Sequence, residues 1–343
     1  ILPHADVVLH ASFDRRGERV VTASRDRTAM IWRVPPEPPE VVTELSPELV
    51  LRGHTDMLWA ANFSHDGARV VSAGRDGTAR IWTLSEPERP RTIEVARAIV
   101  WWAEFSPDDR WVVASADDGT VGVWSVDEPE RPPLMLAGHA ASVGDVHFDP
   151  TQQLIATASV DGTARLYRFE AGADPSEPLE AEAVLTHEHD VYRARFSAEG
   201  LRLLTASRDR TARMWTFDNF GGAPMGPARV FDADPNIVWS SDLSPDGRLV
   251  ALGLGGGQVQ IHPVEGGPPL RLDGHTSDTF RVRFTHDRRW IYSGYNDGDV
   301  RVWSTNRQTH ARVLPGHALA ITALEQRRRV LVSTTRAVEV RDW

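Results

Sequence analysis

Hydrophobic and polar residues alternate in short runs along the chain. The segment "RVVSAGRDGTARIW", residues 69–82, holds two such runs separated by an Asp-Gly pair. A period of two is typical of half-buried β-strands, and Asp-Gly marks a tight turn between them. No segment has a clear helical period. The pattern therefore predicts an all-β chain.

The same pattern returns at regular intervals. The stretch "SRDRTARMW" at 207–215 nearly copies "SRDRTAMIW" at 24–32, and related stretches end at Trp82, Trp124, Tyr167 and Trp303. Each unit also contains an earlier segment with an apolar end, at Phe13, Phe63, Phe105, Phe148, Phe196, Leu243 and Phe284. Successive spacings of 41 to 50 residues fit units of four short strands.

Gly-His pairs stand nine residues before the Phe position, at Gly53–His54, Gly138–His139, Gly274–His275 and Gly316–His317. Together with the aromatic residue that ends each unit, these pairs resemble the WD-repeat family of β-propellers over essentially the whole chain. The resemblance implies one four-stranded blade per unit and a buried hydrogen-bonded set of His, Ser or Thr, Asp and Trp. A buried polar atom without a partner costs ~1–3 kcal/mol, so each set is expected to hold or fail together. The expected structural residues are His4, Thr22, Asp26, Trp32, His54, Ser72, Asp76, Trp82, His139, Thr157, Asp161, Tyr167, His187, Thr205, Asp209, Trp215, His275, Ser293, Asp297 and Trp303.

Three units depart from this pattern. The third has Ala96 and Ala114 where His and the hydroxyl belong, the sixth lacks the set, and the eighth ends with Arg341 in the Trp position. We expect one domain, 1–343, with approximate repeats at 1–52, 53–94, 95–137, 138–185, 186–232, 233–273, 274–315 and 316–343.

The two ends of the chain complement each other. The opening "ILPH" aligns with "LRGH" at 51–54, whereas the chain finishes after a third strand. We therefore expect an eight-bladed propeller in which the N-terminal strand pairs with the last blade, leaving no exposed edge. A seven-bladed ring plus an extra unit is the alternative.

The resemblance also predicts which residues face the top mouth of the central channel. Five residues after each His position, five of eight units carry an aromatic residue: Trp59, Trp101, Tyr192, Trp239 and Phe280. The residue before the turn Asp points to the same face, at Arg25, Arg75, Arg208, Asp117 and Asn296. Trp, Tyr and Arg are enriched at binding hot spots, so we expect these residues to hold a peptide or partner loop. Alternatively, the aromatic residues only plug a wide channel.

Three short motifs resemble chemical sites, but each has a structural explanation. "GLGGGQ" at 253–258 resembles a phosphate loop, yet the chain has no lysine and the motif falls at an expected turn. In "HEHD" at 187–190, His187 belongs to a structural set, which leaves only a weak metal site. "GHTSD" around His275 is in register with the other Gly-His pairs. Inner strands such as "LWAANF" and "IVWWAEF" are apolar and aromatic, so we expect no enzyme, no metal and no cofactor.

Composition narrows the partners. The net charge of −10 argues against nucleic acid, and no apolar run approaches the ~20 residues of a membrane span. The segments "PPEPPEVVTELSPE", "EPERP", "DEPERPP" and "EAGADPSEPLEAE" are acidic and proline-rich, which predicts solvated connectors on the bottom face. The chain has no cysteine, consistent with a cytoplasmic location.

These features predict a non-catalytic interaction scaffold or sensor whose partner is a protein or peptide. All 38 positive charges are arginine, which favours a GC-rich bacterial genome, and the start at Ile1 favours an excised part of a multidomain protein. Bacterial members of the resembled family are commonly fused to Ser/Thr kinases or signalling NTPases. A regulatory, ligand-sensing domain of such a protein is therefore the alternative function, and a propeller enzyme is a weaker one.

Overall fold

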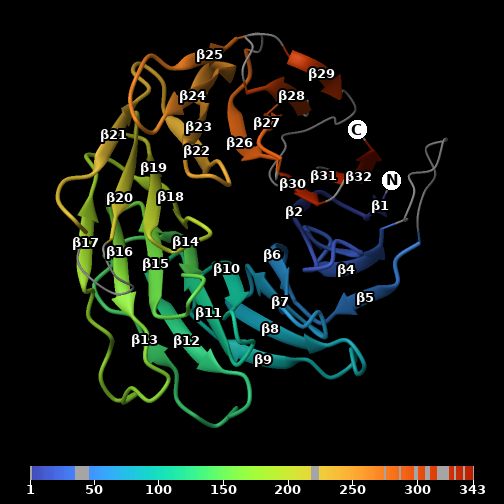
Figure 1. Cartoon of the computed structure of the whole chain (residues 1–343). Coiled ribbons are helices and arrows are strands. Elements are labelled where there is room, and N and C mark those ends of the chain that lie inside the picture. Colours follow the sequence, from blue (N-terminus) through green and yellow to red (C-terminus); the bar gives the residue numbers. More distant parts are fainter. Residues whose placement is uncertain are drawn as a thin grey trace.

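A computed structural model of the chain describes residues 2–34, 46–217, 224–273, 276–285, 287–296, 300–305, 310–314, 324–327, 330–334 and 337–342. Within them the chain forms eight sheets of four antiparallel strands, and the only helical element is a single 3-10 turn, η1 (Gly255–Gly257). The prediction of an all-β, propeller-like fold is confirmed. The sheets are arranged around a common centre, and we number them one to eight in the order of their innermost strands (Figure 1).

In each sheet the strands follow one another outward from the common centre (Figure 1). The innermost strands are β2 (Val8–Phe13), β6 (Leu58–Phe63), β10 (Val100–Phe105), β14 (Val143–Phe148), β18 (Val191–Phe196), β22 (Val238–Leu243), β26 (Thr279–Phe284) and β30 (Leu324–Arg327). The second strands are β3 (Arg19–Ser24), β7 (Arg69–Gly74), β11 (Trp111–Ala116), β15 (Leu154–Ser159), β19 (Arg202–Ser207), β23 (Leu249–Leu254), β27 (Trp290–Tyr295) and β31 (Val330–Thr334).

The third and fourth strands form the outer half of each sheet. The third strands are β4 (Thr28–Arg33), β8 (Thr78–Thr83), β12 (Val121–Ser125), β16 (Thr163–Arg168), β20 (Thr211–Thr216), β24 (Val259–Pro263), β28 (Val300–Ser304) and β32 (Ala337–Asp342). The outermost strands are β5 (Leu49–Arg52), β9 (Arg91–Glu94), β13 (Leu134–Met135), β17 (Ala183–Thr186), β21 (Arg229–Asp232), β25 (Leu270–Leu272), β29 (His310–Leu314) and β1 (Leu2–Pro3).

The two ends of the chain meet in one sheet. Leu2 lies opposite Val338, and Pro3 opposite Ala337, so β1 is the outermost strand of the sheet that also holds β30, β31 and β32. The innermost strand of that sheet, β30, contacts both β26 and β2. Each of the other innermost strands likewise contacts its neighbours in chain order.

Apolar side chains pack between neighbouring sheets. Val21 and Ile31 of the first sheet, for example, form one cluster with Phe63, Val70 and Trp82 of the second. Trp82 is fully buried in this cluster. The apolar faces of each sheet are covered by the neighbouring sheets. The repeats are therefore stabilised by stacking on one another, and none is expected to be stable alone.

A β-bulge interrupts the innermost strand in seven of the sheets, always one residue after the strand begins. The residue left out of the pairing is Leu9, Trp59, Trp101, Gly144, Tyr192, Trp239 or Phe280. A bulged residue is released from the regular alternation of the strand, so its side chain can take a new direction. The bulges therefore account for the placement of these residues at the channel mouth.

The loop at 170–182 differs from the expected solvated connector. Its Leu179 backbone N–H donates to Met135 O (2.7 Å), and the Ala137 N–H donates to Leu179 O (2.9 Å). The Leu179 side chain is partly buried against the apolar cluster of the neighbouring sheets. The loop thus covers the edge of the short strand β13, which needs protection as an outer strand. The proline-rich segment at 35–45 lies outside the described residues.

Candidate functional site: a mouth and a charged channel

Buried polar sets hold individual sheets together. In the second sheet, Trp82 Nε1 donates to Ser72 Oγ (2.8 Å), which lies 2.8 Å from His54 Nε2. His54 Nδ1 lies 2.9 Å from Asp76 Oδ2. Sheets one and five repeat these contacts at 2.6 to 3.2 Å in the sets His4, Thr22, Asp26, Trp32 and His187, Thr205, Asp209, Trp215.

Two further sets vary the pattern. In the fourth sheet, His139 lies 2.6 Å from Thr157 and 2.8 Å from Asp161, but the Tyr167 hydroxyl donates to Ala137 O (2.8 Å). In the seventh sheet, Trp303 Nε1 donates to Ser293 Oγ (2.7 Å). The other two members of that expected set, His275 and Asp297, lie outside the described residues.

Electrostatics fix the direction of these hydrogen bonds. Burial lowers the pKa of His54, outweighing the bond and charge of Asp76, and lowers the pKa of His187 to about 4. Burial opposes ionisation of Asp76 too, but the hydrogen bond and charge of His54 hold its pKa well below the usual range. A neutral His54 donates from Nδ1 to Asp76 and accepts the Ser72 hydroxyl at Nε2. These histidines are therefore committed to structure.

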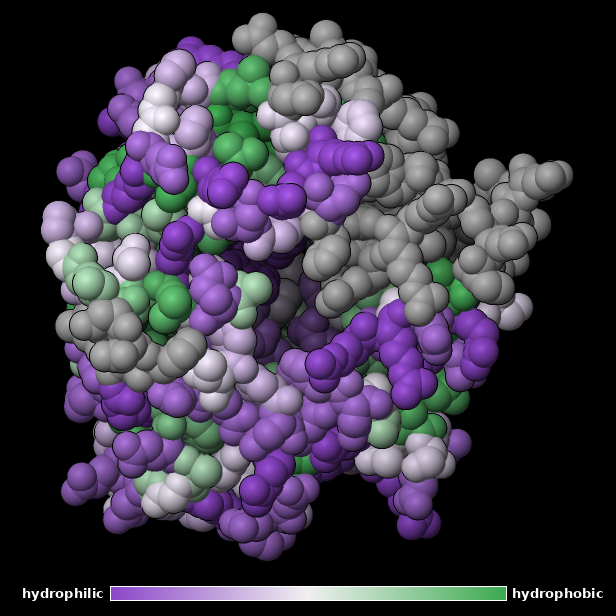
Figure 2. Space-filling model, viewed as in Figure 1, coloured by the Kyte–Doolittle hydropathy of each residue, from purple (hydrophilic) through white to green (hydrophobic). Residues whose placement is uncertain are grey.

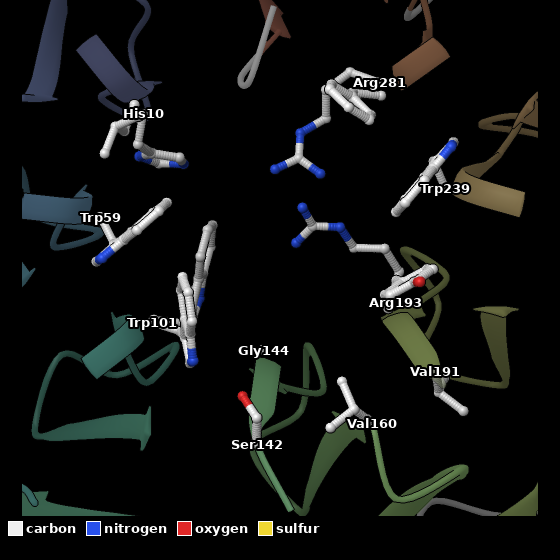
Figure 3. Close-up of a pocket in the computed structure, with 14 residues that line it drawn as sticks. His10, Trp59, Trp101, Ser142, Gly144, Val160, Val191, Arg193, Trp239 and Arg281 are labelled. Carbon is white, nitrogen blue, oxygen red and sulfur yellow. The ribbon is translucent and has the colours of Figure 1, made fainter. Parts of the chain in front are cut away.

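The five predicted aromatic residues meet at one cavity of about 450 Å³ at the centre of the ring (Figure 3). Trp59 and Trp101 lie 4.5 Å apart between ring centroids on one side. On the other side, Tyr192 stacks on Trp239 at 4.9 Å, and Trp239 meets Phe280 edge-on at 5.4 Å. All five side chains are half-buried. Two aromatic walls therefore face each other across the cavity.

None of the five polar residues predicted for the mouth lines this cavity. Arg75 lies 3.8 Å from Asp56 and Arg208 lies 3.5 Å from Asp190, which directs both side chains toward acidic neighbours. Asp117 accepts a hydrogen bond from Trp101 Nε1 (3.1 Å), which helps to orient that ring. Arg25 and Asn296 donate from their backbone to the preceding turn, to Val7 O and Asp278 O respectively.

The arginines that do line the cavity come from the inner strands. Arg193 of β18 and Arg281 of β26 follow the bulged residues Tyr192 and Phe280, and were missed by reasoning from the turns. The signal was present in "VYRARF" and "TFRVRF", where arginine occupies alternate positions of the strand. Figure 3 shows both guanidinium groups extending into the middle of the cavity.

Below the aromatic mouth the channel is charged. His147 Nδ1 lies 2.6 Å from Glu104 Oε2, and its Nε2 lies 3.0 Å from Asp145 Oδ1. Asp145 also pairs with Arg193 Nη1 (3.0 Å) and lies 3.7 Å from Arg195 Nη2. The expectation that the inner strands are uniformly apolar is therefore wrong, because polar side chains on alternate residues face the channel rather than a neighbouring sheet.

This charged layer continues around the ring. Asp242 accepts from Arg283 Nη1 (3.2 Å) and from the Phe284 backbone (2.7 Å). A second cavity of about 240 Å³ includes Arg283 and Arg195 in its lining, and shares three residues with the first: His10, Trp102 and Arg281. On the face shown in Figure 2 the centre of the ring is hollowed, and mainly hydrophilic residues gather around the opening.

The channel charges shift the pKa values of two buried histidines in opposite directions. Burial lowers the pKa of His10 to about 3, helped by the charges of Arg195 and Arg193. Burial and Arg195 oppose protonation of His147 as well, but Glu104 and Asp145 outweigh them and raise its pKa. His147 is thus held between two carboxylates with both ring nitrogens engaged.

The described part of the chain offers no grouping of three or more His, Asp or Glu able to hold a metal ion. No helix in the described ranges is both long and apolar enough to cross a membrane. Chemically, the arrangement can bind: it provides aromatic surface, guanidinium donors and a hollow between them.

The fold and the polar sets together define a propeller-like protein built from WD repeats. The sequence model of the WD40 family, described as "WD domain, G-beta repeat", matches residues 1–33, 45–83, 90–125, 131–168, 181–216 and 266–304. The chain belongs to this family. The two longest unmatched stretches, 217–265 and 305–343, contain most of the sixth unit and the eighth, which lack complete polar sets.

Several relatives share part of this chain. Actin-interacting protein 1 of Drosophila melanogaster is 27% identical over 54% of the chain, and transcription initiation factor TFIID subunit 5 of Caenorhabditis elegans is 31% identical over 48%. WD repeat and HMG-box DNA-binding protein 1 of Xenopus laevis is 27% identical over 53%. The matches span only 30%, 24% and 15% of those proteins.

A solved structure supports the fold over nearly the full length. The crystal structure of the computationally designed Ika8 protein aligns with a TM-score of 0.80, covering 99% of this chain and 98% of that one. The sequence identity is 22%, so the likeness concerns the fold alone.

Proposed function

We propose that the protein is a non-catalytic interaction scaffold that binds a peptide or partner loop at its aromatic mouth. Proteins of the WD40 family generally act as protein-interaction scaffolds. The observation that carries the proposal is the convergence of five aromatic residues, each from a different inner strand, on one cavity of about 450 Å³. That volume lies in the range of ligand pockets.

The aromatic residues support binding better than they support a plug. A plug would bury its side chains and leave no space, whereas all five rings here are half-buried around a hollow. Half-buried aromatic side chains offer contact area at a small cost in side-chain entropy.

We further propose that the eight sheets are the blades of one closed ring, rather than seven blades with an extra unit. The contacts of β30 with both β26 and β2 support closure, as does the pairing of β1 with β32. An eight-bladed ring has a wider centre than a seven-bladed one, which leaves room for the mouth.

A protein partner fits the net charge of −10 better than nucleic acid does, although one relative is by its printed name DNA-binding. The absence of cysteine supports a cytoplasmic location. The alternative, a regulatory domain of a bacterial kinase or signalling NTPase, gains no support from the relatives above, which are animal proteins.

Affinity capture of partners tests the proposal. We expect the intact protein to retain partners that the Trp59→Ala/Trp239→Ala variant loses. Trp290→Ala is the matched control, because Trp290 begins β27 at the end of the sheet away from the mouth. Thermal unfolding of all three accompanies the capture. Equal capture by intact and double-variant proteins, or a steep loss of Tm in the double variant alone, would contradict a binding mouth.

A further inference from the structure

The arginines that line the mouth, Arg193 and Arg281, indicate which kind of ligand it accepts. This inference rests on the proposed function. Arg193 and Arg281 enter the cavity from strands on either side of β22, and their guanidinium groups point toward one another at its centre (Figure 3). Arg193 already pairs through Nη1 with Asp145 Oδ1 (3.0 Å), and a guanidinium presents a planar fork with further donors. An anion between the two guanidinium groups would therefore add a charge-assisted contact to each of them.

The charge balance of the channel agrees with an anionic ligand. Among the described residues of the mouth and charged layer, the arginines outnumber the carboxylates by one, although the whole chain has a net charge of −10. The arginines are Arg193, Arg195, Arg281 and Arg283; the carboxylates are Glu104, Asp145 and Asp242. This excess of one positive charge assumes ionised carboxylates and a neutral His147. Burial raises the pKa of Asp242, and the pKa of His147 is raised as well, so protonation of either group makes the positive charge larger.

The hydrogen-bonding inventory points the same way. Four buried polar atoms of residues lining the two cavities have no partner within the described residues. They are Trp59 Nε1, Arg193 Nε, Arg195 Nε and Trp239 Nε1. All four are donors. The two indole nitrogens point away from the centre of the cavity (Figure 3), so the donors that a ligand could engage there belong to the arginines.

We propose that the mouth recognises an acidic segment of a partner protein, with one Asp or Glu side chain held between Arg193 and Arg281. The residues beside that carboxylate pack against the aromatic walls, with Trp59 and Trp239 on opposite sides. A carboxylate carries one negative charge and matches the small positive excess. A phosphate carries about −1.5 to −2, more than this smallest excess, and the phosphoserine peptide described below tests it directly.

Selection from a displayed library of random heptapeptides on the intact protein tests the ligand chemistry. We expect enrichment of one Asp or Glu flanked by aromatic or other apolar residues. The selected peptide is then synthesised with Glu, Gln or phosphoserine at that position, and each Kd is measured by fluorescence anisotropy. The Glu peptide is expected to bind at least tenfold more tightly than the other two.

Variants assign this preference to the arginines. Arg281→Gln is expected to reduce the Glu-to-Gln difference to less than twofold, whereas Arg75→Gln, which removes the same charge outside the cavity, keeps it tenfold. Arg281→Lys is the second variant if Arg281→Gln does not fold: it keeps the charge but loses the fork, and an intermediate preference is expected.

The failures are distinguishable. Selected peptides that lack an acidic residue but depend on Trp59 and Trp239 would overturn this inference and leave the proposed function standing. Tighter binding of the phosphoserine peptide, or an unchanged Glu preference in the folded Arg281 variants, would overturn the assignment of a carboxylate to these arginines. Failure to select any peptide would count against both proposals.

Discussion

Replacing Ser72 with alanine tests whether the buried polar set acts as a unit. Ser72 and Trp82 are fully buried, and Ser72 Oγ is bonded on one side to Trp82 Nε1 and on the other to His54 Nε2, both at 2.8 Å. Removing the hydroxyl leaves the indole N–H without an acceptor, at a cost of ~1–3 kcal/mol. The lost bond to His54 adds about 1 kcal/mol, so we expect Ser72→Ala to cost about 2–4 kcal/mol of unfolding free energy.

A double-mutant cycle measures the coupling. His54→Ala and Ser72→Ala/His54→Ala are unfolded in denaturant alongside Ser72→Ala, with the exposed Ser46→Ala as a control expected to change stability by less than about 0.5 kcal/mol. We expect the double variant to cost less than the sum of the singles, because the second change removes an already stranded partner. The third sheet shows that such a state is compatible with the fold, since alanine stands at both equivalent positions, Ala96 and Ala114. Additive losses, or a single-variant cost below about 0.5 kcal/mol, would refute the network.

Further predictions concern the turns and the histidines. Gly77 has φ +82° and an added Cβ would meet Ala96 O, so we expect Gly77→Ala to lower the free energy of unfolding by about 2 kcal/mol or more. Arg27 has φ 70° in the equivalent turn, so we expect Arg27→Gly to raise the free energy of unfolding by about 0.5 kcal/mol. Denaturant unfolding measures both changes. The pKa of His187 is lowered to about 4 in the folded protein, so the unfolded state takes up more protons and stability should fall as the pH drops from 6.5 toward 4, less so in His187→Gln. The raised pKa of His147 has the opposite sign: its contribution is fully present below pH 6.5 and is lost as the pH rises through the folded pKa, so a Tm profile of His147→Gln should lack this alkaline decline.

Most of the fold and part of the candidate site could be predicted from the sequence repeat. Alternation and Asp-Gly turns located the strands, and the position five residues after His selected the bulged aromatic residues, because both features recur in register. Arg193 and Arg281 escaped this reasoning because they are one residue further along, where a bulge changes which face the strand presents. The turn arginines were misplaced for a related reason. Their acidic neighbours belong to a different turn at the same end of the sheet, so the sequence of the arginine's own turn does not reveal them. Asp56, which lies beside Arg75, is an example.

The pairing of β1 with β32 has a consequence for the order in which the protein assembles. Seven described sheets are made of strands that follow one another in the chain, so each can form as soon as its own residues leave the ribosome. The remaining sheet joins Leu2–Pro3 to Ala337–Asp342, and contacts between residues so far apart in the chain form slowly. During synthesis the first strand therefore has no partner until the last one exists. In the proposed closed ring this pairing is a late event, and until it forms both β1 and the outer edge of β32 lack a partner strand.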